Sequence, residues 1–265
     1  MFPDGCIRGN MRPVTDLPPP EPPPPPVSPP PTPYAAPAPS FPAPPAALPA
    51  DRVRAAWHRR NESDYIFDFW TALGWSILTC GIYGFYVIYQ LVRRSRDHNA
   101  RRIELLDAAT TLAWEQAQSK GLADELRSAF ERIAPHMAVL RNQATQFRDP
   151  VVWMIISLLT GGIVHFIIYI LLDGDLITHD HAEGAVESEL STIYTRLGAP
   201  VAGPNPARLK SPHNYVGRIV ATLLTCGIYG LWWQYDLMTE GNRHFQENWA
   251  WEDGLAQSVQ QLIAA

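Results

Sequence analysis

The chain has 265 residues, a net charge of −5 and three cysteines, Cys6, Cys80 and Cys226. An odd number of widely spaced cysteines excludes the disulfide framework of a small secreted protein. No basic excess suggests a nucleic-acid partner, and we expect none. The mean hydropathy of −0.12 resembles that of a soluble protein, but it averages segments of very different character.

The N-terminal segment is predicted to be a disordered, proline-rich tail over residues 1–55. Twenty of the 26 prolines precede residue 50. Such a segment has little apolar surface to bury and stays solvated as polyproline II or coil. It either docks on a polyproline-binding protein with an aromatic-lined groove or serves only as a spacer. We expect no cleavable signal peptide, because no apolar stretch precedes residue 50.

Three later runs, residues 69–92, 151–172 and 219–235, contain 24, 22 and 17 residues with almost no charge. A membrane-crossing helix needs about 20 such residues. Tryptophan and tyrosine gather toward the ends of the runs, where their rings favour the headgroup layer. The pattern predicts an all-α membrane protein; a soluble bundle with three buried core helices is the alternative.

The three runs are copies of one another. Residues 78–84, with the sequence LTCGIYG, recur unchanged at 224–230, and a diverged copy occupies 159–165. Small residues at this spacing let membrane helices approach closely, so we predict packing and self-association through these faces. The predicted repeat-core residues are Thr79, Gly81, Ile82, Tyr83, Gly84, Thr160, Gly162, Ile163, Thr225, Gly227, Ile228, Tyr229 and Gly230.

The repeat core resembles the bacterial integral-membrane family called domain of unknown function 4234, whose hallmark is a threonine-x-glycine-isoleucine-tyrosine core followed by aromatic residues. The third repeat matches this hallmark from Thr225 to Tyr229 and continues to Trp233. The first repeat matches the core but has Val87 at the tryptophan position, and the second has Val164 for the tyrosine. The resemblance implies residence in the cell membrane and implies no activity.

The predicted organisation has five parts: the tail over 1–55, a first membrane repeat over 62–99, a helical insert over 100–148, a diverged second repeat over 149–198, and a third repeat with a C-terminal amphipathic helix over 199–265. Two apolar stripes in the insert predict antiparallel helices joined near Gly121. Arginines flanking the insert favour a cytoplasmic position, whereas the acidic segment 173–189 is the better candidate for the outside.

Two membrane arrangements remain open. Three unbroken spans, giving a multi-pass protein, satisfy the backbone most simply and are favoured. However, arginines between residues 52 and 60 oppose an external tail. In the alternative, each repeat is a re-entrant hairpin broken at its glycines, and every connection stays cytoplasmic.

A histidine follows each repeat threonine by nineteen residues, at His98, His179 and His244. If the repeats converged, three imidazoles could hold a metal ion. Three spans would instead invert the middle repeat and put His179 on the opposite face, so the expectation is no metal and no cofactor. His165 is the one ionisable group within an apolar run, and such a position is a functional hypothesis by default.

No phosphate loop, nucleophile elbow or paired-histidine zinc helix is present in the sequence, and we expect no enzyme. The favoured function is a membrane scaffold or interaction protein with the lipid bilayer as its first partner. A small oligomeric transporter or channel subunit is the alternative, because internal repeats are common in transport folds. A metal-binding membrane protein that uses the repeat-equivalent histidines is the second alternative.

Overall fold

A computed structural model describes residues 48–145, 149–161, 163–205 and 213–264. All of them belong to one compact unit, Ala46–Ala265, and the described residues form helices and no strands. The all-α prediction is therefore confirmed. The proline-rich residues 1–47 lie outside the described residues, as does Gly162. Helix α1 begins at Pro49, so residues 49–55 are helical although the predicted tail extends to residue 55.

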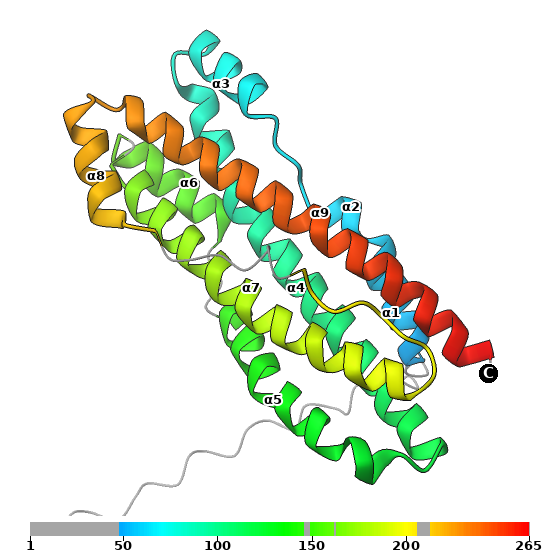
Figure 1. Ribbon diagram of the computed structural model, residues 1–265. Helices are drawn as coiled ribbons and strands as arrows, with labels where there is room; N and C mark the ends of the chain where they lie inside the picture. The colour runs from blue at the N-terminus through cyan, green and yellow to red at the C-terminus, as the bar shows by residue number, and fades with distance from the viewer. Residues whose placement is uncertain (1–47, 146–148, 162, 206–212, 265) are drawn as a thin grey trace, which may run out of the picture. The chain divides into compact units, whose positions relative to one another are not determined.

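Each apolar run folds into a short helix and a long helix joined by a turn, and each such unit is called a hairpin (Figure 1). The short helices of the first and third hairpins pack on their own long helices, whereas the short helix of the second packs on the long helix of the first. The three pairs are α3 (Phe69–Leu78) with α4 (Ile82–Ser119), α6 (Pro150–Leu159) with α7 (His165–Arg196), and α8 (Tyr215–Leu224) with α9 (Ile228–Ala264). The preference for unbroken helices is wrong, because every run is interrupted at its threonine-x-glycine turn. Within the described part of the chain, none of the helices combines the length and apolar character required to cross a membrane.

The turn reverses the chain through two consecutive residues with positive φ. In the first repeat these are Cys80 (φ 51°) and Gly81 (φ 91°). Their N–H groups donate to carbonyls of the preceding turn, Cys80 to Ile77 at 3.1 Å and Gly81 to Ser76 at 2.7 Å, which is the Schellman pattern that ends a helix. The third repeat has the same geometry, with Cys226 at 49° and Gly227 at 95°.

The repeat threonine joins the two helices of its hairpin. The hydroxyl of Thr79 donates to the Trp75 carbonyl at 2.7 Å and accepts from the Tyr83 N–H at 2.9 Å. Thr225 makes the equivalent pair of bonds, at 2.8 Å and 2.9 Å. One side chain thus adds a second hydrogen bond to a carbonyl of the first helix and satisfies an orphan donor of the second.

The other predicted core residues differ in their surroundings. A Cβ at Gly230 would lie 3.1 Å from Thr222 of α8, so this glycine permits close approach of α8 and α9. A Cβ at Gly84 would meet nothing within 4 Å. The isoleucines Ile82, Ile163 and Ile228 are exposed and do not form a packed core.

Each short helix begins at a residue whose side chain caps it. Asp68 accepts from Thr71 N at 2.6 Å, Asp149 from Val151 N at 2.8 Å, and Asn214 from Gly217 N at 2.9 Å. All three capping residues precede their repeat threonine by eleven positions. The duplicated unit therefore begins at its cap and specifies both ends of the short helix.

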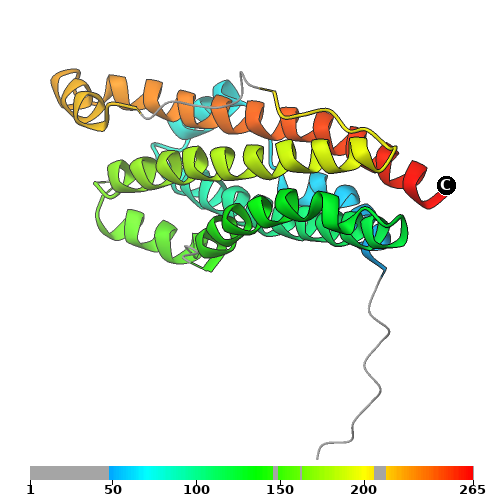
Figure 2. The ribbon, with the colours of Figure 1, turned by 60° about the horizontal axis from the view of Figure 1, so that its bottom comes forward.

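The long helices α4, α7 and α9 lie side by side and lead away from the hairpin turns in the same direction (Figures 1 and 2). An apolar core near the turns contains the equivalent residues Leu91, Leu172 and Leu237. A second core, farther from the turns, contains the equivalent residues Ala109, Leu190 and Leu255. The stretch of each helix between these cores is strongly polar.

Helices α1 (Pro49–His58) and α5 (Ala123–Thr145) complete the second core, and the short α2 (Arg60–Ser63) lies against α4. The chain reverses at Gly121 (φ 69°), as predicted, and α5 packs against α4 and α7. Helix α1 packs on α4 and α9, with the Trp57 indole donating to Asp253 at 2.8 Å. The acidic segment predicted as an outside loop instead forms part of α7, and several of its carboxylates are buried.

The turn can be tested with two glycines three residues apart. We expect Gly81→Ala to lower the free energy of unfolding by about 1–2 kcal/mol, because alanine resists the left-handed backbone. Gly84→Ala is the matched control: it lies in a helix beside open space and should raise stability by about 0.5–1 kcal/mol. Denaturant unfolding followed by circular dichroism measures both. Equal effects of the two substitutions would contradict the role given to the turn.

Candidate metal centre

A buried polar layer separates the two apolar cores. Its side chains recur at four-residue intervals on the inner faces of the three long helices, and Asp64 reaches in from the segment that follows α2. The layer consists of Asp64, His98, Arg101, Arg102, His179, Asp180, Glu183, Glu187, His244, Asn248 and Glu252.

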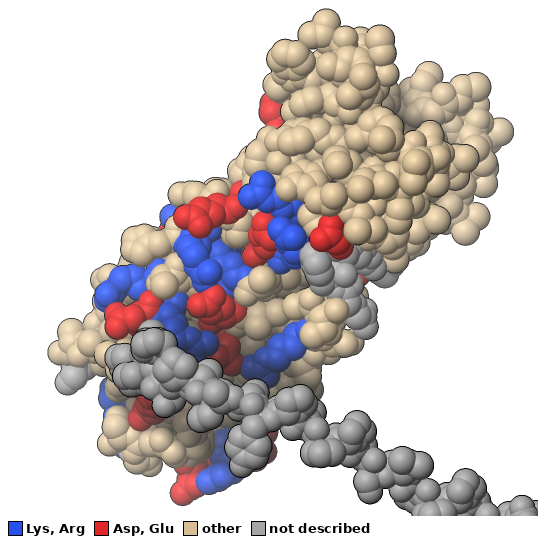
Figure 3. Space-filling model, turned by 180° about the vertical axis from the view of Figure 1, so that it is seen from behind, with Lys and Arg blue, Asp and Glu red and all other residues tan. Residues whose placement is uncertain are grey.

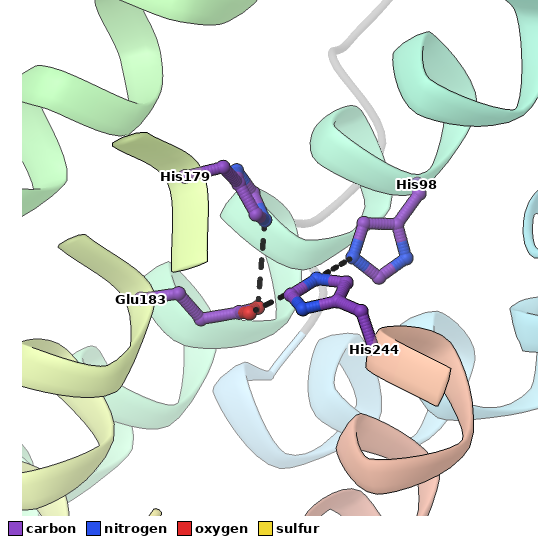
Figure 4. Close-up of side chains that lie close together, drawn as sticks. All are labelled: His98, His179, Glu183 and His244. Atoms are coloured by element: carbon purple, nitrogen blue, oxygen red, sulfur yellow. Dashed lines mark hydrogen bonds and ion pairs between the residues drawn. The ribbon is translucent and has the colours of Figure 1, made fainter. Parts of the chain in front are cut away.

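The three repeat-equivalent histidines meet in this layer, together with Glu183 (Figure 4). One ligand atom from each of the four side chains lies within 4.8 Å of all the others, and all four residues are buried. His98 Nε2 and His244 Nε2 are 3.2 Å apart, and the Glu183 oxygens lie 3.5 Å from His244 Nε2 and 3.7 Å from His179 Nε2. Each hairpin thus contributes a histidine to one point.

Two of the rings are oriented by carboxylates. His98 Nδ1 is 2.9 Å from Asp64, and His244 Nδ1 is 3.1 Å from Asp180. Since an ionised carboxylate only accepts hydrogen bonds, Nδ1 carries the proton in both rings and Nε2 presents a lone pair. This carboxylate–histidine arrangement is typical of metal-binding histidines, in which it fixes the tautomer and strengthens the ligand.

The protonation states agree with this arrangement. Burial lowers the pKa of His98 to about 3, although Asp64 opposes the shift. Burial alone would raise the pKa of Asp64, but its contacts with His98 and Arg101 hold that pKa below the usual range. A neutral imidazole beside an ionised aspartate is the state in which His98 can coordinate a cation.

Lone pairs face one another in the centre. Two deprotonated Nε2 atoms cannot hydrogen-bond each other, although those of His98 and His244 are 3.2 Å apart. The Asn248 amide nitrogen lies 3.1 Å from His244 Nε2 and 3.0 Å from Glu183, so it can donate to both. Neither ring nitrogen of the buried His179 has a hydrogen-bond partner among the described residues. A cation between the rings would give these facing lone pairs a common partner.

The charge balance around the histidines also favours a cation. Arg102 contacts Glu183, Glu187 at 2.5 Å and Glu252 at 2.9 Å. Arg101 contacts Asp64 and Glu252, each at 2.7 Å. With Asp180, the described layer holds five carboxylates against two guanidinium groups, and burial raises the pKa of Glu252 accordingly. The buried guanidinium of Arg94 lies one helical turn before His98, and a divalent ion beside the histidines would reduce the remaining excess of buried negative charge.

The distances suit a tetrahedral ion. Two ligand atoms held at about 2.0–2.1 Å from a tetrahedral zinc ion lie about 3.3–3.4 Å apart. Three separations, 3.2 Å between His98 and His244 and 3.5 and 3.7 Å from the two Glu183 oxygens to His244 and His179, lie near that value, and all four ligand atoms lie within 4.8 Å of one another. Three imidazoles and one carboxylate are ligands that zinc accepts, and four protein ligands complete its coordination.

The prediction that three unbroken spans would keep His179 apart is wrong, because all three long helices run in the same direction from their turns. Glu183, Asp64 and Asp180 were not predicted as site residues. The repeat register contained a signal: Arg102, Glu183 and Asn248 all follow their repeat threonine by 23 positions, so polar residues occupy the column one turn after the histidines.

Other ionisable groups in the apolar region do not join the centre. His165 begins α7, where its ring stacks on Tyr169 with centroids 6.2 Å apart. His213 Nδ1 lies 3.0 Å from both oxygens of Asp173, with Glu240 3.8 Å from its Nε2. Asp173, His213 and Glu240 form a second, less buried group whose ligand atoms lie within 4.8 Å of one another.

Comparison with known proteins places part of the chain in a described family model. Neither the curated proteins nor the solved structures include one that matches this chain. Residues 67–114, which contain the first hairpin and His98, match the family model described as Domain of unknown function (DUF4234), and this match confirms the resemblance seen in the repeat core.

Proposed function

We propose that the chain is a metal-binding protein in which His98, His179, His244 and Glu183 hold one divalent transition-metal ion, with zinc as the best match. The observation that carries this proposal is the convergence of four buried ligand atoms within 4.8 Å, one histidine from each hairpin. Asp64 and Asp180 support it by orienting two of the rings.

The metal's proposed role is structural. Four protein ligands leave no open coordination position, whereas catalytic zinc sites usually keep one position for water or substrate. The ligands come from α4, α7 and α9, so the ion would cross-link the three hairpins at one level. We propose a non-enzymatic scaffold protein at a membrane, in which the metal ion at the histidine site holds the helices of the bundle together.

Metal content is the first measurement. Purified full-length protein exposed to zinc and then desalted should retain about one ion per chain. His98→Ala with His244→Ala should abolish that retention, while the exposed His58→Ala is the matched control and should leave it unchanged. Cobalt(II) substitution adds a second readout, since a tetrahedral site gives intense visible absorption. Metal-free wild-type protein after zinc reconstitution would refute the proposal.

The orienting carboxylate can be tested separately. Asp180→Asn keeps the shape of the side chain but weakens its hold on His244 Nδ1. Outer-shell changes of this kind lower metal affinity about 10–100-fold. Competition with a chromophoric chelator measures that affinity, and Asp124→Asn on the exposed start of α5 is the control. Unchanged affinity in the Asp180 variant would remove this carboxylate from the site.

Stability should follow metal occupancy. Free zinc at a hundredfold excess over Kd should stabilise the folded protein by about 2.7 kcal/mol, provided that the unfolded chain does not bind it. A chelator should therefore lower the melting temperature of the wild-type protein and leave that of the double histidine variant unchanged. Thermal unfolding followed by circular dichroism measures both, and equal responses in the two proteins would contradict a structural role.

A further inference from the structure

The three hairpin tips, defined as residues 69–86, 150–167 and 215–232, expose the same apolar residues in each repeat. The leucine before each threonine is largely exposed: Leu78 at 72%, Leu159 at 79% and Leu224 at 79%. The isoleucine after each turn is exposed as well. An isolated exposed leucine is ordinary, but equivalent clusters on three tips form a surface that water does not favour.

Aromatic side chains accompany this surface. Trp70 and Trp75 on α3, Tyr86 on α4 and Trp232 on α9 are exposed. Tryptophan and tyrosine favour the boundary between hydrocarbon and water, where the ring is apolar and its N–H or O–H group stays wet. The chemistry of the tips therefore matches a lipid bilayer better than the surface of another protein.

Charged residues begin at the base of the tips. Figure 3 shows one end of the molecule almost free of charge and a dense band of basic and acidic side chains beyond it. The capping residues Asp68 and Asp149 mark this boundary in the first two hairpins, and the Arg218–Asp236 ion pair, at 2.9 Å, marks it in the third. An apolar end with a charged band behind it is the profile of a protein partly immersed in a membrane.

The length of the short helices sets the depth. Each has ten residues, which corresponds to about 15 Å at 1.5 Å per residue. The hydrocarbon core of a bilayer is about 30 Å thick, so the tips would reach its middle and turn back. In the turns of the first and third hairpins, the N–H groups of residues 80–84 and 226–230 donate to acceptors within the hairpin, which lowers the cost of placing the turns in lipid.

The geometry points to a monotopic protein whose three tips enter the hydrocarbon of a single leaflet from one side. Every connection between hairpins then lies on that side. Three spans would have placed the arginines between residues 52 and 60 on the outside of the membrane, against the preference of basic residues for the cytoplasmic side. With half-insertion, these arginines lie on the same side of the membrane as Arg93 and Arg96. We therefore replace the expectation of a multi-pass protein with half-insertion, in which the tips enter one leaflet and no helix crosses the membrane.

Cys80 and Cys226 are exposed in the turns and serve as native depth probes. The full chain with Cys6→Ser, labelled with a small fluorophore and reconstituted in phosphatidylcholine–phosphatidylglycerol vesicles, should be quenched most strongly by lipids brominated near the end of the acyl chain. Strongest quenching by shallow bromines, or by an aqueous quencher, would overturn the depth assignment.

Sidedness is tested with Lys120→Cys and Asn205→Cys, placed singly in a chain with Cys6, Cys80 and Cys226 replaced by serine. Position 120 follows α4 and position 205 follows α7. An impermeant thiol reagent should label both positions from the same side of sealed vesicles. Labelling from opposite sides would establish a span between them and overturn half-insertion.

Substitutions on the apolar surface of the tips distinguish two possible partners of that surface, a lipid bilayer and a second copy of the chain. We expect Leu78→Arg, Leu159→Arg and Leu224→Arg together to lower the vesicle-bound fraction at least about tenfold, since arginine is costly in hydrocarbon. Ile263→Arg, at an exposed apolar residue of the opposite end, is the matched control and should change nothing. The lipid assignment would be refuted if the wild-type protein did not bind vesicles but formed oligomers, and if the triple substitution dissociated those oligomers. Metal retention is measured in parallel, so the two proposals fail independently.

Discussion

The turn after ten residues is the constraint on which the rest of the structure depends. Two consecutive positive φ values at Cys80 and Gly81 reverse the chain, and Thr79 bonds to both helices that meet there. Because each repeat folds back in this way, all three long helices start at the same end and run in the same direction. A fixed offset of nineteen residues from threonine to histidine then brings the three imidazoles to one level. Without the reversal, an inverted middle repeat would carry His179 away from its partners.

The polar layer can exist because the repeat register is exact across three helices. The leucine column twelve residues after the threonine closes the layer on the side of the turns, and the column thirty residues after it closes the other side. Removing one partner from a buried ion pair typically costs about 3–5 kcal/mol. A slip of one residue in α4 would separate Arg102 from three carboxylates at once. The layer therefore specifies the alignment of the hairpins, which the two apolar cores alone would define less strictly.

The sequence predicted the helical class, the repeats, the reversal at Gly121 and the histidine column, because each leaves a local or periodic signal. It favoured unbroken spans and kept hairpins only as the alternative, since an apolar run of 24 residues fits both a span and a folded pair, and cysteine is an unusual residue for a left-handed position. The acidic segment of α7 resembled a solvated loop. Its partner Arg102 is 81 residues from Glu183, so local charge patterning could not identify the pairing.

The proposed metal ion and the proposed membrane contact both depend on the height of the three hairpin tips along the bundle axis. His98 and His244 each lie sixteen residues after the first residue of their long helix, or about 24 Å along the axis. With the tips about 15 Å deep in hydrocarbon, the centre would lie about 9 Å outside it, just beyond the headgroup layer. A metal ion there would be separated from lipid by the leucine layer. Because the ion binds α4, α7 and α9 at one height, it holds the three tips level, and a level set of tips is what entry into a single leaflet requires.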